Sequence, residues 1–295
     1  MRKFLICMII LASSLLSALQ LERSEAYIEF EISSLSELNK LSRIISIDDI
    51  SGNTVTANVN QKELDRFESL GYSYRLLPRE HLTGDFMASE LDYGEMRDWD
   101  SYPTYEIYTE MMYQFAQDHP DICTMTSLGT SVQGRELLIA KISDNPEMAE
   151  NEPEFLYIGQ LHGDELVTYM LLLRLIDYLL ENYELDDRIT DLINNTEIWI
   201  NPLANPDGTY AGGNHTVNGA VRRNANNVDL NRNFPDMLDG DHPDGNDWQP
   251  ETEILMELAR NKNFVLSSNF HSGAEVVNYP WDRIQIRHAD DDWWQ

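Results

Sequence analysis

The sequence contains very little cysteine. Only Cys7 and Cys123 occur among 295 residues, and Cys7 lies in an apolar stretch near the N-terminus. A single remaining cysteine excludes an internal disulfide framework, and neither cysteine has the spacing of a thiolate zinc site. We therefore expect Cys123 to be a small buried side chain.

Basic residues are scarce as well. The chain has 21 Lys and Arg against 51 Asp and Glu, a formal net charge of −30. Nucleic acids and anionic membranes attract basic surfaces, so this charge argues against either as a partner. Solubility, or a salty habitat, explains the acidity most simply.

Long apolar runs are lacking after the first twenty residues or so. Arg2 and Lys3 precede the apolar run 4–19, which is short for a membrane span, and small residues follow at 24–26. This pattern predicts a signal peptide over 1–26, a mature chain from about Tyr27, and a secreted or periplasmic protein without a membrane partner. An uncleaved anchor is the alternative.

The rest of the chain shows two patterns. Residues 27–78 have the order strand, helix, strand, strand, helix, strand, which predicts a small α+β ferredoxin-like module. Residues 79–100 are charged and without period, which is typical of a linker. From residue 101 strands alternate with helices, so we expect an α/β domain over 101–295 with a mixed, largely parallel sheet flanked by helices.

Polar residues follow two apolar runs that we interpret as buried strands. His162 and Glu165 follow the run 155–159, and His271 follows 264–270. A spacing of three lets His162 and Glu165 reach one ion, and sites in open α/β sheets form at the carboxyl ends of strands. By themselves these two residues are more typical of a polar turn between a strand and a helix, with Glu165 complementing the helix dipole. Together with His271 they make a sufficient ligand set for a catalytic zinc that keeps one position open for water.

Arginines are concentrated in the segment between these ligands. Arg222, Arg223 and Arg232 fall within eleven residues, and Asn231 adds amide donors. A guanidinium group matches a carboxylate bidentately, so this segment is a candidate carboxylate-binding site. The alternative is a surface loop whose arginines pair with nearby acids. Asp207 and Asp229 are candidate acceptors for a ligand histidine.

The order of these motifs resembles the zinc metallocarboxypeptidases of the carboxypeptidase A/B superfamily, nearest to the branch with carboxypeptidases N, E, D and M. The resemblance covers about 101–295. It rests on HGDE at 162–165, NPDG at 205–208, NNVDLNRNFPD at 226–236 and NFHSGAEVVNYPWD at 269–282. The order of elements in 27–78 is similar to the prosegment of secreted members, which blocks the active-site cleft until it is cleaved.

The resemblance implies a secreted enzyme that hydrolyses C-terminal residues from peptides or proteins with a free C-terminus, using one Zn²⁺ per chain. We expect it to be a monomer. The implied zinc ligands are His162, Glu165 and His271, with Asp229 as the partner of the first histidine. Arg222, or Arg223 if the alignment slips by one, would polarise the scissile carbonyl. The substrate's terminal carboxylate would be bound by Asn231 and Arg232.

Two residues of the family pattern find no counterpart. The general-base glutamate and a substrate-binding tyrosine are expected well after His271, so we expect the chain to be a C-terminally truncated piece of a longer reading frame, catalytically impaired by itself. Two other interpretations stay open. One is a cell-wall peptide amidase of the same family, and the other is a non-catalytic domain that retains zinc.

Overall fold

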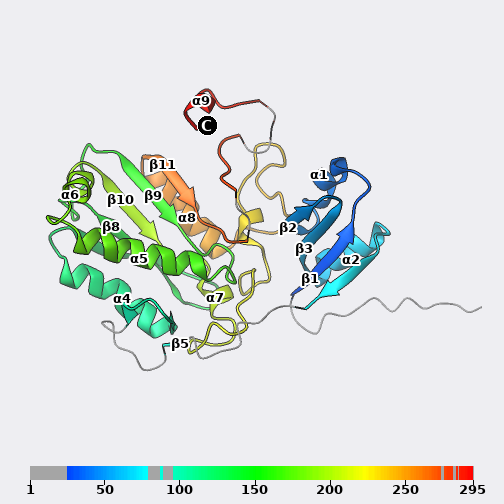
Figure 1. Ribbon diagram of the computed structural model, residues 1–295, viewed down its shortest axis with the longest axis horizontal. Coiled ribbons are helices and arrows are strands. Elements are labelled where there is room, and N and C mark those ends of the chain that lie inside the picture. Colours follow the sequence, from blue (N-terminus) through cyan, green and yellow to red (C-terminus); the bar gives the residue numbers. More distant parts are fainter. Residues whose placement is uncertain are drawn as a thin grey trace, which may run out of the picture. The chain divides into compact units, whose positions relative to one another are not determined.

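The computed structural model describes residues 25–78, 87–88, 96–273, 276–281, 284 and 286–294 (Figure 1). Nearly all of the expected signal peptide and most of the expected linker lie outside these residues. The described chain divides into two compact units: the first comprises residues up to Ile47 and Gly52–Leu77, and the second comprises Asp48–Ser51 and the residues from Pro78 onward. Within the described residues, every helix is too short or too polar to cross a membrane.

The first unit has the strand and helix order of a ferredoxin-like module. Its four-stranded sheet has the order β2-β3-β1-β4, and β1 is antiparallel to both β3 and β4. Leu64 and Phe67 of α2 are buried in one core with Ile28, Phe30 and Val55 of the sheet. The elements are β1 (Glu25–Glu31), η1 (Leu35–Glu37), α1 (Leu38–Leu41), β2 (Ser46–Ser51), β3 (Thr54–Asn60), α2 (Gln61–Ser69) and β4 (Tyr74–Leu77).

Local sequence signals explain where α2 begins and ends. The Asn60 side chain accepts the N–H of Glu63 at 2.9 Å, and the Glu63 carboxylate accepts the N–H of Asn60 at 2.9 Å, which is a reciprocal capping box. Gly71 has φ +82° just past the helix, a backbone angle that glycine adopts without strain. The first helix of the expected order is short: a 3₁₀ turn, η1, precedes it, and α1 itself spans only Leu38–Leu41.

The second unit is built on a five-stranded sheet with the order β11-β9-β10-β8-β7. β9 is parallel to β10 and β11, whereas β8 is antiparallel to β10 and β7, so the sheet is mixed as expected. A separate short pair is formed by β5 (Met87–Ala88) and β6 (Tyr102–Pro103). The strands of the large sheet are β7 (Cys123–Thr130), β8 (Glu136–Ile142), β9 (Glu154–Ile158), β10 (Glu197–Asn201) and β11 (Phe264–Asn269).

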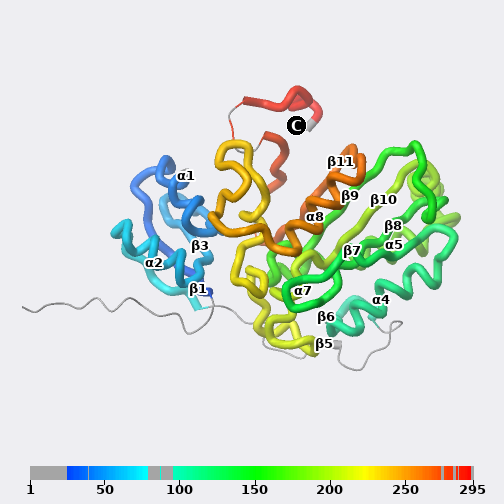
Figure 2. Tube along the Cα trace, turned by 180° about the vertical axis from the view of Figure 1, so that it is seen from behind, coloured from blue at the N-terminus to red at the C-terminus, as the bar shows by residue number. Residues whose placement is uncertain are grey.

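Helices cover both faces of this sheet. Side chains alternate along β8: Leu138 and Ala140 join a core with α4 and α5, whereas Ile139 joins a cluster with Leu258 of α8. The view from behind shows α8 on the face opposite α4 and α5 (Figure 2). The helices are α4 (Tyr105–Asp118), α5 (Val167–Glu181), α6 (Asp187–Ile193), α7 (Pro206–Thr209), η2 (Leu230–Arg232), α8 (Pro250–Asn261) and α9 (Asp291–Trp294).

The last strand differs from its sequence-based interpretation. We expected a buried strand over 264–270, but five of the six residues of β11 are exposed. Among the described residues, β11 is the outermost strand of the sheet and pairs with β9 on one side. An apolar run cannot by itself distinguish a central strand from an edge strand, because both have the same local sequence pattern.

Cys123 is buried at the start of β7, as its isolation in the sequence predicted. Burial raises the pKa of its thiol to about 12. The thiol of an unfolded chain ionises near pH ~8.5. The free energy of unfolding should therefore fall as the pH rises between these two values, since only the unfolded state then loses the proton.

We predict that a Cys7→Ser variant shows no thiol reactive to a disulfide reagent at pH 8 while folded, and one after denaturation. Fast labelling of the folded protein would contradict the burial of Cys123. The same experiment with Cys123→Ser as well should give no labelling in either state.

Candidate metal centre

The predicted ligands meet at the carboxyl edge of the parallel strands. His162 and Glu165 lie in the loop between β9 and α5, and His271 lies two residues after β11, the neighbour of β9. Parallel neighbours end at the same edge of a sheet, so residues far apart in the chain come together there. Glu165 precedes the first residue of α5, so the His162–Glu165 pair lies in the loop and not on the helix.

The Glu165 carboxylate lies between the two imidazole rings. One oxygen, Oε1, is 2.8 Å from Nδ1 of His162, and the other, Oε2, is 2.9 Å from Nδ1 of His271. The ring centres are 4.6 Å apart. Oε2 also accepts the backbone N–H of Ser272 at 3.1 Å, which ties the turn after β11 to the loop after β9.

These three side chains fit a zinc ion. Their ligand atoms all lie within 4.8 Å of one another. Both histidines turn Nδ1 toward the shared centre, and the far nitrogen of His162, Nε2, is 3.1 Å from Oδ1 of Asp229. A histidine that binds a metal through one nitrogen usually donates the other N–H to a carboxylate, so Asp229 occupies the expected place.

The charges of the site are strongly coupled. Burial alone would raise the pKa of the Glu165 carboxyl, but hydrogen bonds from His162 and His271 lower it to about 2. Burial likewise opposes ionisation of Asp229, yet Arg222 and His162 hold its pKa well below the usual range. Both carboxylates are therefore ionised at neutral pH, as a cation site requires.

Arg222 lies beside the predicted ligands. Its Nε donates to Oδ2 of Asp229 at 2.9 Å, and its Nη1 is 3.9 Å from Oε1 of Glu165. Burial disfavours its charge, but Asp229 more than offsets this and raises the pKa of the guanidinium. The adjacent Arg223 is fully buried.

Asn231 and Arg232 lie in the short helix η2. Asp229 caps this helix by accepting the N–H of Asn231 at 3.0 Å. The amide nitrogen of Asn231 is 3.4 Å from Nε2 of His271, and Arg232 donates to the backbone oxygen of Asn231 at 3.1 Å. Both side chains are partly exposed next to the metal centre.

Asp207 does not have the role that we expected from its motif. Instead of holding a ligand histidine, it accepts hydrogen bonds from Ser131 Oγ at 2.8 Å, Gln133 N at 2.8 Å and Arg135 Nη1 at 2.7 Å. It thereby fixes the turn between β7 and β8. Turn motifs do not reveal long-range partners, because those partners lie more than seventy residues away in the chain.

Sequence reasoning missed two residues that hold the loops of the site together. Asn205 donates to the backbone oxygens of Leu161 at 3.3 Å and Arg222 at 3.2 Å, and it caps α7 by accepting Gly208 N at 2.9 Å. Gly163 approaches α7 so closely that a Cβ there would lie 2.3 Å from the carbonyl carbon of Gly208. Both belong to quoted motifs, but only their contacts show why these residue types are needed.

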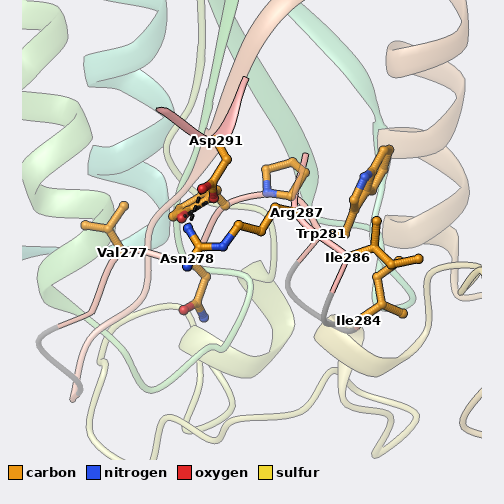
Figure 3. A pocket seen from close by; sticks show the side chains of 9 residues that line it. Val277, Asn278, Trp281, Ile284, Ile286, Arg287 and Asp291 are labelled. Atoms are coloured by element: carbon orange, nitrogen blue, oxygen red, sulfur yellow. Dashed lines mark hydrogen bonds and ion pairs between the residues drawn. The ribbon is translucent and has the colours of Figure 1, made fainter. Parts of the chain in front are cut away.

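A separate hollow of about 210 Å³ is formed by the C-terminal segment (Figure 3). Three of the residues that line the hollow are linked by hydrogen bonds. The hydroxyl of Tyr279 donates to Oδ1 of Asp291 at 2.8 Å, and Arg287 donates to Oδ2 of Asp291. It contains none of the predicted site residues. Its lining is Val277, Asn278, Tyr279, Pro280, Trp281, Ile284, Ile286, Arg287 and Asp291.

A family model described as zinc carboxypeptidase matches residues 108–295, which is more than half of the chain. The chain therefore belongs to the zinc carboxypeptidase family, as its motifs predicted.

Curated relatives agree with this assignment. Carboxypeptidase D of Rattus norvegicus is 46% identical over 185 residues, which are 61% of this chain and 13% of that protein. The carboxypeptidase N catalytic chain of Rattus norvegicus is 39% identical over 201 residues, covering 61% of this chain and 44% of that protein. The chain thus spans less than half the length of these relatives.

Solved structures share the fold. Thrombin activatable fibrinolysis inhibitor is similar with a TM-score of 0.64 at 15% identity, covering 92% of this chain and 77% of that one. Carboxypeptidase A from Helicoverpa armigera is similar with a TM-score of 0.58 at 22% identity, covering 84% of this chain and 70% of that one.

The hydrogen bond between His162 and Asp229 yields a prediction. Asp229→Asn keeps the shape of the side chain but removes the charge that orients the ring, so zinc affinity should fall roughly 10–100-fold. Competition with a chromophoric chelator measures it. Asp241→Asn, at an exposed position, is the control and should bind zinc like the parent. Equal affinity in both variants would rule out this role for Asp229.

Proposed function

We propose that the protein is a secreted zinc-dependent carboxypeptidase that removes C-terminal residues from peptides. The observation that carries the proposal is the convergence of His162, Glu165 and His271, with ligand atoms within 4.8 Å of one another, beside the guanidinium of Arg222. The relatives named carboxypeptidase D and carboxypeptidase N support the same reaction class.

His162, Glu165 and His271 would hold one zinc ion, leaving a position for water. When bound, zinc lowers the pKa of this water to about 7 and polarises the peptide carbonyl. Glu165 supplies negative charge to the site, and Asp229 fixes the ring of His162. Cell-wall peptide amidase activity would use the same ligand set, but a site for a free α-carboxylate favours the carboxypeptidase.

Arg222 is suited to stabilise negative charge that develops on the carbonyl oxygen. Its guanidinium is buried, and the bond from Nε to Asp229 fixes its direction before substrate binds. A preorganised donor of this kind is typically worth ~10²–10³ in rate. We prefer Arg222 to Arg223 for this role because its Nη1 is 3.9 Å from Glu165.

Asn231 and Arg232 are suited to bind the terminal carboxylate of the substrate. Both are partly exposed and lie within three residues of Asp229, and the amide nitrogen of Asn231 is 3.4 Å from Nε2 of His271. A guanidinium and an amide together bind a free carboxylate and discriminate against an amidated or extended C-terminus. This requirement would make the enzyme an exopeptidase.

The reaction also needs a group that takes the proton from water and passes it to the leaving amine. The family resemblance places this glutamate well after His271, and we assign the role to no residue of this chain. A non-catalytic zinc-binding domain would lack such a group altogether, so the activity of the complete protein decides between the two interpretations.

The N-terminal part completes the proposal. We propose a signal peptide over 1–26, a prosegment-like module over 27–78, a linker over 79–100 and the catalytic domain from 101. The order of elements and the sheet order β2-β3-β1-β4 support the module. β1 begins at Glu25, two residues before the proposed mature start.

The net charge bears on the partners of the protein. A formal charge of −30 favours a monomer that repels other copies and does not bind nucleic acid.

The test uses the protein expressed from its complete reading frame and blocked dipeptides with free or amidated C-termini. We expect cleavage of the free-carboxylate peptides alone, abolished by 1,10-phenanthroline and restored by Zn²⁺. Cleavage of amidated peptides would favour an amidase. Bound zinc without cleavage of any peptide would favour the binding domain.

Arg232 provides a sharper prediction. In Arg232→Ala, KM for free-carboxylate peptides should rise about 100-fold, in line with the ~1.5–3 kcal/mol of a charged hydrogen bond, while zinc affinity stays unchanged. Arg188→Ala, an exposed arginine on α6, is the matched control. A parallel loss of zinc affinity in Arg232→Ala would assign Arg232 a structural role instead.

A further inference from the structure

A second cluster of possible ligands lies in the loop between β8 and β9. Asp144, Glu150 and Glu152 each offer a carboxylate oxygen, and these oxygens all lie within 4.8 Å of one another. The loop precedes β9, whereas His162 follows it, so the cluster lies at the opposite edge of the sheet from the predicted zinc ligands.

Glu197, the first residue of β10, adds a fourth carboxylate from beneath the loop. It is fully buried, and its Oε1 accepts the backbone N–H of Glu150 at 2.9 Å and lies 3.0 Å from Nζ of Lys141. Its second oxygen, Oε2, is buried without a hydrogen-bond partner in the described residues. A buried carboxylate oxygen without a donor is costly, so this atom needs an explanation.

The same shortage of donors recurs in the loop. Asp144 Oδ1 and Glu152 Oε2 are also buried atoms without a hydrogen-bond partner among the described residues. Glu150 is better satisfied, because its Oε2 accepts the amide of Asn145 at 3.0 Å. Three of the four carboxylates therefore have one buried oxygen without a hydrogen-bond partner among the described residues.

Negative charge in this loop exceeds the positive charge next to it, which also favours a bound cation. Lys141 is paired with Glu197, and its Nζ also donates to the backbone oxygen of Met148. Lys262 acts on Glu197 from further away and pairs with Glu154 at 3.8 Å. Burial and then the charges of Glu150, Asp144 and Glu197 raise the pKa of Glu152. A divalent cation would both neutralise this excess and satisfy the oxygens.

We propose that Asp144, Glu150 and Glu152 bind one structural Ca²⁺ ion, in the loop that lies on the buried carboxylate of Glu197. Calcium takes oxygen ligands at 2.3–2.6 Å in flexible geometry, so oxygens up to ~4.8 Å apart can share one ion. The cluster has no nitrogen or sulfur ligand, which distinguishes it chemically from a zinc site. The ion fixes the loop before β9, which is tied to β10 by the hydrogen bond from Glu150 N–H to Glu197, at the strand ends remote from the predicted zinc ligands.

The experiment titrates Ca²⁺ into zinc-loaded protein in buffer stripped of metals by resin. We expect calorimetry to show one Ca²⁺ per chain, a higher melting temperature with Ca²⁺, and no loss of zinc. Tb³⁺ serves as a luminescent substitute, since the ring of Trp199 lies 5.7 Å from Nζ of Lys141 and can sensitise it. Ca²⁺ should displace the bound Tb³⁺.

Variants locate the ion. Asp144→Asn/Glu152→Gln should lose the Ca²⁺ response, and without Ca²⁺ it should melt at or above the parent temperature because repulsion is relieved. Glu152→Gln alone should bind Ca²⁺ roughly tenfold more weakly, since affinity follows the charge of the ligands. Glu147→Gln removes an exposed charge from the same loop and should respond like the parent.

Two results would overturn the proposal. One is the absence of Ca²⁺ binding by the parent protein at millimolar concentration. The other is an unchanged Ca²⁺-dependent rise in melting temperature in Asp144→Asn/Glu152→Gln. Both results are independent of peptidase activity, so the calcium site and the proposed function can fail separately.

Discussion

The buried carboxylate of Asp229 is the interaction on which the metal centre depends. It accepts hydrogen bonds from His162 at 3.1 Å, Arg222 at 2.9 Å and the backbone of Asn231 at 3.0 Å. One side chain thus contacts a predicted zinc ligand, fixes the guanidinium of the proposed oxyanion donor and caps the helix that carries the proposed carboxylate-binding residues. Burying a charge is costly unless its oxygens are satisfied, and here each is matched by a donor that the site itself uses.

The backbone around this carboxylate is held by close packing as well as by hydrogen bonds. Asn205 ties the loop after β9 to the arginine segment, and Gly163 leaves space for α7 to lie against that loop. Asn224 donates to Gln249 at 3.0 Å and to Glu251 at 3.1 Å, which anchors the approach to Asp229 against the start of α8. The metal ligands therefore rest on a framework of buried amides, whose fixed positions preorganise the site.

The carboxyl ends and the amino ends of the parallel strands offer different chemistry. The carboxyl edge combines imidazole nitrogens with one carboxylate, a set suited to zinc, and keeps arginines next to it. The amino edge carries carboxylates with few donors, which suits a hard cation. The acidity of the chain is thus not spread uniformly, because three partly buried carboxylates gather in one loop, where like charges repel one another.

The sequence by itself determined most of the elements and the chemistry of the candidate metal-binding edge. Strand and helix periods, the capping box at Asn60 and the order of the His, Arg and Asn motifs are local signals, readable within a few residues. Only the tertiary structure decided which atoms meet. His162 reaches Asp229 across 67 positions, and His271 reaches Glu165 across 106. Asp207 turned out to hold the β7–β8 turn, β11 to lie exposed at an edge, and Glu197 to be buried beneath a loop of acids. No local pattern encodes these outcomes, because burial and pairing depend on which distant segments fold against a residue.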